Sequence, residues 1–360
     1  MKKSKPSFIL LSILIDRLIF LAGVVLSASE HRRSFTLFQM DGEWRAEMKA
    51  MKRLDVLESH LVKVPDYADA GGGGAIVDTG AGDCEVKVRG TLLRHIEAWE
   101  AAGAGAFALG VIKEGFKLSM VSTPEAYEED NNKSFEKDRE FAIEAVQKLL
   151  KLEILKEVQR NEVTCVNPLT VAINGVGKRR LCIDLSRCVN EVNNSYKFKI
   201  ESTLKFLEVV KQGDWLFAFD LKSAYHQIEM FREHWKFLGL ALKIDGLKKF
   251  FVFTCLPFGL NDAARVLTKL LRFPLQRWRS WGVKAFVHLD DGIGAVQGQG
   301  EAQRASDVVK ADLAQFGLMT SEDKCTWTVT QEIEWTGWRI DTREFMIYVP
   351  ERKIVKAEDK

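Results

Sequence analysis

The segment FVHLDDGIGA, residues 286–295, places two adjacent carboxylates between two short apolar runs that are typical of β-strands. Neighbouring like charges repel each other, and apolar surroundings increase the cost because they remove the water that screens charge. A chain that holds Asp290 and Asp291 in this setting therefore needs either an exposed turn or a compensating cation. Asp and Gly favour tight turns, so the segment taken alone is explained well by a plain hairpin turn.

A third carboxylate, Asp220, ends another strand-like run, WLFAFD at residues 215–220. Such a residue is more often a strand end than a metal ligand. If this strand lies beside the hairpin, however, three carboxylates meet at one edge of a sheet. Mg²⁺ prefers such hard oxygen ligands, and two ions about 3.5–4 Å apart can stabilise the attacking and leaving oxygens of a phosphoryl displacement. The pattern is therefore compatible with a metal site for phosphoryl transfer, and a plain hairpin turn with an ordinary strand end is the alternative.

Composition limits the other classes of function. Of 360 residues, 46% are hydrophobic and 28% charged, which predicts that most of the chain folds. The formal net charge is only +2, so any binding of nucleic acid must come from local basic patches. The six cysteines form no C-x-x-C pair, which argues against a zinc site or a disulfide framework and fits a reducing compartment.

The N-terminus has a basic start followed by an apolar run over residues 8–28, which resembles a signal peptide or a membrane anchor. Asp16 and Arg17 interrupt this run, and each charge costs roughly 2.5–3.5 kcal/mol at the centre of a membrane helix. A buried or interfacial helix is the alternative. We expect a protein of the cytoplasm or nucleus without a membrane partner, and an anchor through residues 8–28 is the competing prediction.

From Thr164 onward, short runs rich in β-branched and aromatic residues alternate with helical patterns. Strands mixed with helices predict an α+β fold, with helices on one side of a sheet. Gly317 follows the last helical pattern, as a C-terminal cap would. Helical periodicity covers residues 92–102, 133–157, 200–210, 261–272 and 301–316.

Three blocks have the order and spacing of motifs A, B and C of reverse transcriptases: FDLKSAYHQI (residues 219–228), LPFGLNDAARVLTKLL (256–271) and HLDD (288–291). Residues 167–190 also resemble the fingers strands of these enzymes, and residues 316–325 and 333–341 resemble motifs D and E. From about residue 131 to 349 the chain is thus similar to an RNA-directed DNA polymerase of a retroelement. The words NNKS (131–134) and NPLTVAI (167–173) resemble the DIRS-like, tyrosine-recombinase-bearing retrotransposons most.

The resemblance implies a right-hand polymerase fold, with fingers, an antiparallel palm sheet covered by helices on one face, and a largely missing thumb. With no thumb to clamp the duplex, we expect weak, salt-sensitive binding and short products. The expected parts are an apolar segment at 1–30, a mixed region at 31–120 with a Gly-rich linker at 70–75, fingers at 121–212, a palm at 213–349 with motifs A to E, and a truncated tail at 350–360.

By resemblance, Asp220, Asp290 and Asp291 would hold two Mg²⁺ ions, for which Mn²⁺ is a possible substitute, with the carbonyl of Leu221 as a further ligand. The implied reaction is attack of a primer 3′-hydroxyl on the α-phosphorus of a deoxynucleoside triphosphate, with release of pyrophosphate. This nucleotidyl transfer depends mainly on positioning and charge neutralisation. The implied partners are an RNA or DNA template with its primer. The sequence does not indicate an oligomeric state.

Further roles also come from the resemblance. Tyr225 would be the steric gate that excludes a 2′-hydroxyl, and Gly259 would let the backbone approach the nucleotide. Arg180 and Lys178 would bind the triphosphate, and Lys324 would assist the leaving pyrophosphate as an acid. The ordinary alternatives are a packed aromatic ring, a simple turn, a solvated charged face and a surface lysine.

Some positions depart from the family pattern. His288 stands where an aromatic residue usually begins motif C, and Ala264 and Leu267 replace the common proline and phenylalanine of motif B. The chain also ends soon after motif E, with no room for an RNase H or recombinase domain. A second hypothesis is therefore a truncated relic that at most binds nucleic acid without catalysis.

Overall fold

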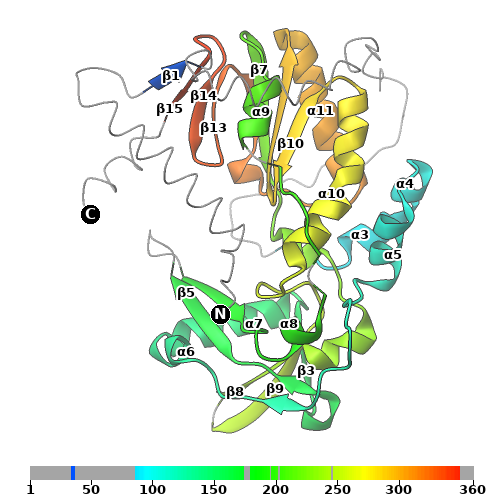
Figure 1. The fold of residues 1–360 in the computed structure, drawn as a ribbon, viewed down its shortest axis with the longest axis vertical. Coiled ribbons are helices and arrows are strands. Elements are labelled where there is room, and N and C mark those ends of the chain that lie inside the picture. The colour runs from blue at the N-terminus through cyan, green and yellow to red at the C-terminus, as the bar shows by residue number, and fades with distance from the viewer. Residues whose placement is uncertain are drawn as a thin grey trace, which may run out of the picture. The chain divides into compact units, whose positions relative to one another are not determined.

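The computed structural model describes residues 34–36, 86–173, 179–194, 196–201, 203–244 and 246–348 (Figure 1). Lys178 and the predicted segments at 8–28, 70–75 and 350–360 lie outside the described residues. The chain divides into two compact units. The smaller unit comprises Met1–Glu58, Lys211–Asp214 and Gln331–Lys360, and the larger comprises Ser59–Val210 and Trp215–Thr330.

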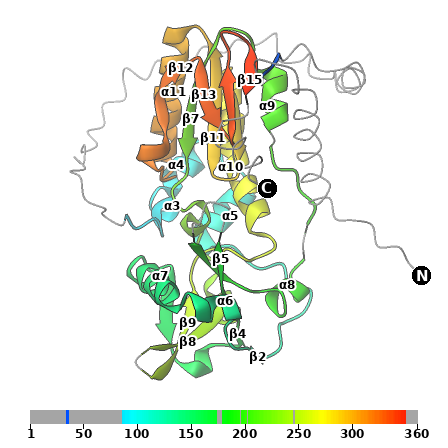
Figure 2. The same ribbon diagram turned by 90° about the vertical axis from the view of Figure 1, so that its left-hand side faces the viewer.

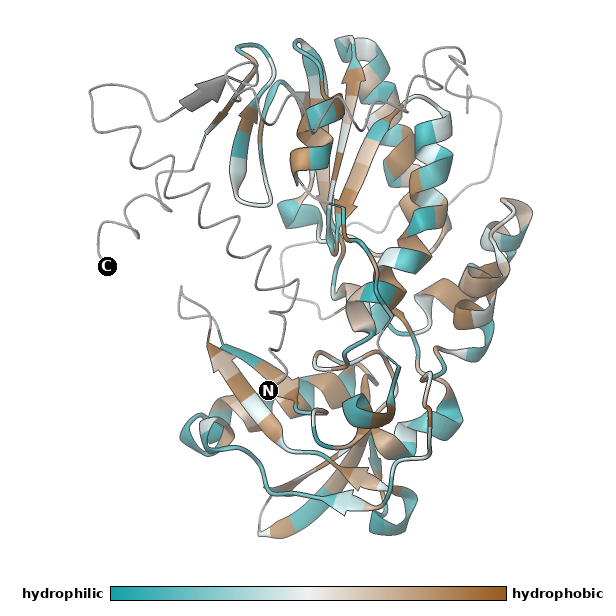
Figure 3. Cartoon of the chain, in the orientation of Figure 1, coloured by the Kyte–Doolittle hydropathy of each residue, from teal (hydrophilic) through white to brown (hydrophobic). Residues whose placement is uncertain are grey.

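The larger unit contains a four-stranded sheet that joins segments far apart in the sequence. The β10–β11 and β7–β12 pairs are antiparallel. Two helices pack against the sheet, and both carry hydrophilic residues on their outward sides, whereas the strands are largely apolar (Figure 3). The strand order is β10 (Lys284–His288), β11 (Asp291–Gln297), β7 (Asp214–Asp220) and β12 (Thr326–Thr330), and the helices are α10 (Ala263–Ser280) and α11 (Gln299–Gln315).

Two glycines of β11 allow the aromatic residues of β7 to lie across it. A Cβ atom on Gly292 would lie 2.2 Å from the ring of Phe219, and one on Gly294 would lie 2.2 Å from the ring of Phe217. Glycine in a strand interior often marks such a close approach. The ring of Phe219 also meets Trp278 of α10 edge-on at 5.8 Å. The contact between sheet and helix therefore depends on β11 lacking side chains at these positions.

The same unit contains a five-stranded sheet and a separate two-stranded hairpin. In the larger sheet the β2–β4 and β4–β8 pairs are parallel, while β8–β9 and β9–β3 are antiparallel. Its order is β2 (Tyr127–Glu128), β4 (Cys165–Val166), β8 (Gly239–Ile244), β9 (Leu247–Phe253) and β3 (Leu155–Val158), and the hairpin is β5 (Leu169–Ile173) with β6 (Arg179–Ile183). Helices α6 (Lys133–Lys137), α7 (Arg139–Lys151), α8 (Val189–Val192) and α9 (Thr203–Val209) accompany them.

The α+β fold predicted from the sequence is confirmed, although the helix predicted over 261–272 extends to Ser280. The helical pattern over 133–157 was wrong at its end, because the helix stops at Lys151 and Leu155–Val158 forms strand β3. The reason is tertiary: Leu155 pairs with Phe253 of β9, and this pairing requires an extended backbone. Gly317 follows α11 with φ of 69°, as predicted for a helix cap.

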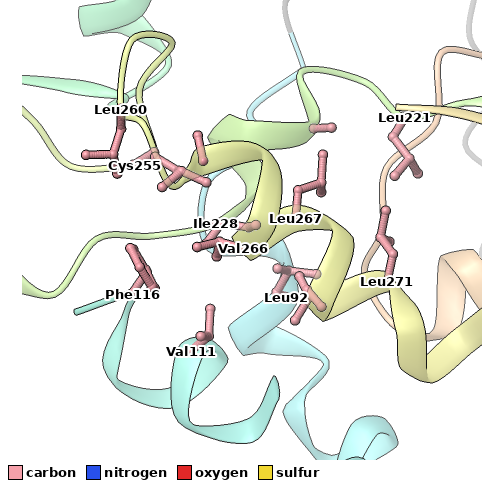
Figure 4. Packing of buried hydrophobic residues seen from close by; sticks show 14 of the residues in the cluster. Leu92, Val111, Phe116, Leu221, Ile228, Cys255, Leu260, Val266, Leu267 and Leu271 are labelled. Atoms are coloured by element: carbon pink, nitrogen blue, oxygen red, sulfur yellow. The ribbon is translucent and has the colours of Figure 1, made fainter. Parts of the chain in front are cut away.

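Three short helices upstream belong to the same core. They are α3 (Thr91–Arg94), α4 (Ile96–Ala101) and α5 (Ala106–Glu114). The indole N–H of Trp99, which is fully buried, donates to the carbonyl of Phe316 at 2.8 Å. Val111 of α5 lies beside the buried face of α10, which carries Val266 and Leu267 (Figure 4). This segment is therefore an integral part of the larger unit.

The smaller unit is built on an antiparallel sheet. Its order is β1 (Ser34–Thr36), β15 (Met346–Tyr348), β14 (Trp338–Asp341) and β13 (Glu332–Trp335). Thr336 and Gly337 have φ of 47° and 77°, the left-handed values that suit a two-residue hairpin between β13 and β14. Within the described residues of the chain, no helix is both long enough and apolar enough to cross a membrane.

We predict that Gly292→Ala lowers the free energy of unfolding by about 1–3 kcal/mol, the usual cost of overpacking, because its methyl group would meet the ring of Phe219. Urea unfolding of the whole chain measures this. Gly300→Ala is the matched control, since its nearest neighbour is a guanidinium nitrogen of Arg304 at 3.8 Å. Equal stability of the two variants would contradict the prediction.

Candidate active site

The two adjacent carboxylates lie at a strained hairpin. His288 pairs with Asp291 across β10 and β11, so Leu289 and Asp290 form a two-residue turn. Leu289 has φ of 61°, which is a costly conformation for a bulky side chain and one that such turns usually give to glycine. The Gly292 that seemed to complete an Asp-Asp-Gly turn lies instead inside β11, paired with Val287.

The end of β7 lies against this turn. The backbone N–H of Leu221 donates to the carbonyl of Asp290 at 2.9 Å, and β7 is the sheet neighbour of β11. Asp220, the last residue of β7, is therefore brought beside the hairpin, as the positions of the strand ends predicted. Strands β7 and β11 are labelled in Figure 2. Asp220 is buried, with 8% of its surface exposed.

The electrostatics of Asp291 show how crowded the carboxylates are. Burial, followed by the negative charges of Asp290 and Asp220 and a hydrogen bond with Asp220, raises the pKa of Asp291 to about 6. Asp291 therefore keeps its proton to a higher pH than an ordinary aspartate does. The three groups therefore carry more negative charge than this partly buried edge of the sheet accommodates easily.

Lys324 supplies part of the missing positive charge. It ends the short 3₁₀ helix Glu322–Lys324, and its Nζ donates to Oδ1 of Asp220 at 2.9 Å. This hydrogen bond raises the pKa of Lys324. The sequence indicated a role for Lys324 but not this pairing, which depends on the packing of the preceding loop: the N–H of Ser321 donates to the carbonyl of Asp220 at 2.8 Å.

The carboxylates have the donor chemistry of a site for a hard divalent cation. Within the described residues, no group of three His, Cys, Asp or Glu side chains is arranged to hold a metal ion as it stands. The Lys324 ammonium already pairs with Asp220 and so compensates charge that a cation would otherwise neutralise. The donor set therefore fits a divalent cation, provided that Lys324 is displaced from Asp220.

Tyr225 lies close to the carboxylates. It is a half-buried residue of the 3₁₀ helix Ala224–Gln227, and burial, followed by the charge of Asp290, raises its pKa. Its ring meets that of Phe258 edge-on at 4.9 Å. The neighbouring His226 also contacts Phe258, at 5.5 Å, and its burial lowers its pKa to about 4. His226 is therefore neutral near pH 7 and packs against Phe258, as Tyr225 does.

Gly259 is required by a close backbone contact. It has φ of 122°, and a Cβ atom there would lie 2.0 Å from the carbonyl oxygen of Ile183. The side chain of Asn190 holds the same loop, because its Nδ2 donates to the carbonyl of Gly259 at 2.8 Å and its Oδ1 accepts from the N–H of Asn261 at 3.0 Å. Sequence reasoning missed Asn190. Contact of Gly259 with a nucleotide stays a prediction.

Arg180 borders a cavity of about 600 Å³ that also contains Phe258 and His226. Within the described part of the chain, Arg180 makes no ion pair, whereas its neighbour Arg179 pairs with Asp138 at 3.2 Å. Arg180 is therefore the better placed of the two to meet an anion. Since Phe258 contacts Tyr225, the cavity adjoins the residues around the carboxylates.

Comparisons with known proteins agree with this geometry. The family model described as reverse transcriptase (RNA-dependent DNA polymerase) matches residues 154–340, just over half of the chain. A solved foamy viral protease-reverse transcriptase in complex with dsDNA is 18% identical, with a TM-score of 0.53, covering 68% of this chain and 47% of that one. The foamy viral protein in complex with RNA/DNA hybrid is 18% identical, with a TM-score of 0.52, covering 62% and 28%.

At this level of identity the structural similarity shows the fold alone, which is that of the reverse transcriptase polymerases. The chain spans less than half the length of these solved chains. No curated protein matches the sequence.

We predict that Asp291→Asn changes the pH dependence of stability in metal-free buffer. The folded pKa of about 6 exceeds the usual 3.8, so the folded state binds the proton more tightly and the contribution of Asp291 to stability falls as pH rises from about 4 to 6. The variant lacks this loss. The melting temperature of the variant minus that of the native chain should therefore be larger at pH 7.5 than at pH 4.5. EDTA is present in all samples. An unchanged difference between the two pH values would contradict the prediction.

Proposed function

Because the chain belongs to the reverse transcriptase (RNA-dependent DNA polymerase) family, we propose that it adds deoxynucleotides to a primer 3′-hydroxyl along an RNA or DNA template. The convergence of Asp220, Asp290 and Asp291, which come from two neighbouring strands of one sheet, carries this proposal. A general metal nuclease would need the carboxylates but not the adjoining Tyr225 and the loop around Gly259.

In this proposal Asp220, Asp290 and Asp291, with the carbonyl of Leu221, would hold two Mg²⁺ ions, for which Mn²⁺ could substitute. When bound, these ions supply Lewis-acid neutralisation of the phosphoryl oxygens. The protein keeps its ligands in place through backbone hydrogen bonds, so little reorganisation is needed during reaction. Asp220 would have to release Lys324 before it could hold an ion.

Lys324 is proposed to act after it leaves Asp220. Its Nζ already lies within 2.9 Å of a carboxylate oxygen of the cluster, so a short movement of this long side chain would bring it to the leaving pyrophosphate. While paired with Asp220 its pKa is raised and it holds its proton tightly. Release of Asp220 removes that effect, which makes Lys324 a better acid at the moment the pyrophosphate needs a proton.

The nucleotide is proposed to lie between the carboxylates and the side of the 600 Å³ cavity that carries Arg180. Arg180 would bind triphosphate oxygens through its guanidinium fork, with Lys178 as a second cation. The half-buried ring of Tyr225, fixed by Phe258, would leave no room for a 2′-hydroxyl. Gly259 would allow the loop to pass close to the base.

The nucleic-acid partners are proposed by analogy with the foamy viral proteins, which were solved in complex with dsDNA and with RNA/DNA hybrid. We also propose a DIRS-like subgroup, on the resemblance of two sequence words that contact each other. Oδ1 of Asn131 accepts from the N–H of Leu169 at 2.9 Å, and Oγ of Ser134 accepts from the N–H of Val171 at 3.2 Å. The two words thus form one structural unit at β5.

One observation favours the alternative of a non-catalytic relic. No described group of ligands is arranged to hold a metal, and Lys324 occupies Asp220. In that alternative the chain would bind nucleic acid, and the carboxylates would have no chemical role.

Primer extension on an RNA template, with and without Mg²⁺, separates the two proposals. We predict extension by the native chain and a loss of about 10³-fold or more in Asp290→Asn, since a metal contributes several kcal/mol of transition-state stabilisation. Asp323→Asn, an exposed carboxylate next to Lys324 in the sequence, is the matched control and should retain activity. Equal incorporation by native chain and Asp290→Asn, or none by either when both bind the primer–template, would favour the relic.

A further inference from the structure

A groove made of two adjoining cavities follows helix α10 away from the carboxylates. Its wider part, a cavity of about 640 Å³, lies among α5, α10 and residues 196–198. Its narrower part, of about 190 Å³, continues along α10 and reaches Leu289, the turn residue next to Asp290. The two parts share Thr268 and Arg272, and we call the whole the α10 groove.

Positive charge is concentrated in the α10 groove, although basic and acidic residues nearly balance over the whole chain, at 52 and 50. Its two acidic side chains already have partners: Glu114 pairs with Lys117, and Glu201 accepts from Arg279 at 2.7 Å. Arg265 is also paired, with Asp262, so the positive charge of the groove comes mainly from Lys197, Lys199, Lys269 and Arg272. The basic residues that line the groove are Lys117, Lys197, Lys199, Lys205, Arg265, Lys269 and Arg272.

Helix α10 holds part of this charge on a fixed scaffold. Arg265, Lys269 and Arg272 recur at intervals of four and three residues, which places them along one face of the helix. The other face carries Val266 and Leu267 into the core (Figure 4). Packing of the buried face therefore fixes the orientation of the helix, so that the three basic residues lie in a row along its exposed face.

Aromatic rings alternate with these cations. Residues 196–199 read Tyr-Lys-Phe-Lys, and 50% of the surface of Tyr196 is exposed. The guanidinium of Arg265 lies 4.9 Å from the Tyr196 ring, and Nζ of Lys269 lies 3.9 Å from the Phe107 ring. A basic channel with exposed aromatic faces is the arrangement by which proteins bind single-stranded nucleic acid, since phosphates meet the cations and bases stack on the rings.

We propose that the α10 groove binds a single-stranded stretch of nucleic acid, with phosphates on the Lys197, Lys199 and Arg272 side chains and a base stacked on Tyr196. Helix α5 forms one wall of the groove through Phe107. This helix lies outside the region that matches the family model, residues 154–340, so a segment upstream of the polymerase motifs contributes to the site. The path toward Asp290 rests on the proposed function, but strand binding itself does not.

The test is fluorescence anisotropy of a labelled 20-nucleotide oligo(dT), measured with the full chain in EDTA over a series of KCl concentrations. Lys197→Gln with Lys199→Gln should lower the slope of log K against log salt by about 1.4, since each single-strand phosphate contact contributes roughly 0.7. Tyr196→Ala should weaken binding about tenfold with little change in slope, and Tyr196→Phe should restore the affinity. The control is Lys133→Gln with Lys137→Gln, two exposed lysines of α6 that do not line the groove.

Binding by the groove variants equal to that of the α6 control would overturn the proposal. Loss of binding in the lysine variant without any effect of Tyr196→Ala would also overturn it, because the groove would then be a general polyanion surface. The outcome is separable from that of the proposed function. If the native chain extends no primer but the groove variants bind oligo(dT) more weakly, strand binding by the groove is supported and the polymerase function is not. If the native chain extends primers and the groove variants bind oligo(dT) as the native chain does, only the polymerase function is supported.

Discussion

The candidate site depends on the position of β7 beside the β10–β11 hairpin. The hydrogen bond from the N–H of Leu221 to the carbonyl of Asp290, 2.9 Å long, joins the end of one strand to the turn of the other. Gly292 permits this approach because it leaves room for the ring of Phe219. Packing and backbone bonding thus hold three carboxylates close together. Burial, followed by the neighbouring negative charges, raises the pKa of Asp291 as a result.

Local sequence predicted this meeting of carboxylates because each stands at the end or turn of an apolar strand. It did not predict the Lys324–Asp220 pair, which depends on how the loop before Lys324 bonds to β7. The alternative of a plain Asp-Asp-Gly turn would have placed Gly292 in the turn, whereas Gly292 lies in β11. The contact that excludes a side chain there comes from Phe219, far away in sequence. Hydrophobic periodicity likewise predicted a helix that continues beyond Lys151. The pairing of β3 with β9, which ends the helix, cannot be predicted from the sequence of β3 alone.

Helix α10 links the two surfaces considered for function. Its buried face, with Val266 and Trp278, packs against α5 and the sheet that holds Asp220. Its exposed face carries Arg265, Lys269 and Arg272 along the groove. The upstream helices α3–α5 are part of this arrangement, because Trp99 bonds to the end of α11 and Val111 lies against α10 (Figure 4). The hydrophobic core that supports the site thus includes helices upstream of residues 154–340, the region that matches the family model.

The central claim is that Asp220, Asp290 and Asp291 form a divalent-metal site in which Lys324 competes with the metal for Asp220. Electron paramagnetic resonance titration of Mn²⁺ at pH 7.5, with a primer–template present, tests it most directly. The account predicts specific binding by the native chain, its loss in Asp220→Asn, and binding at least as tight in Lys324→Gln, in which no ammonium competes for Asp220. Equal Mn²⁺ binding by native chain and Asp220→Asn, or weaker binding in Lys324→Gln, would contradict it.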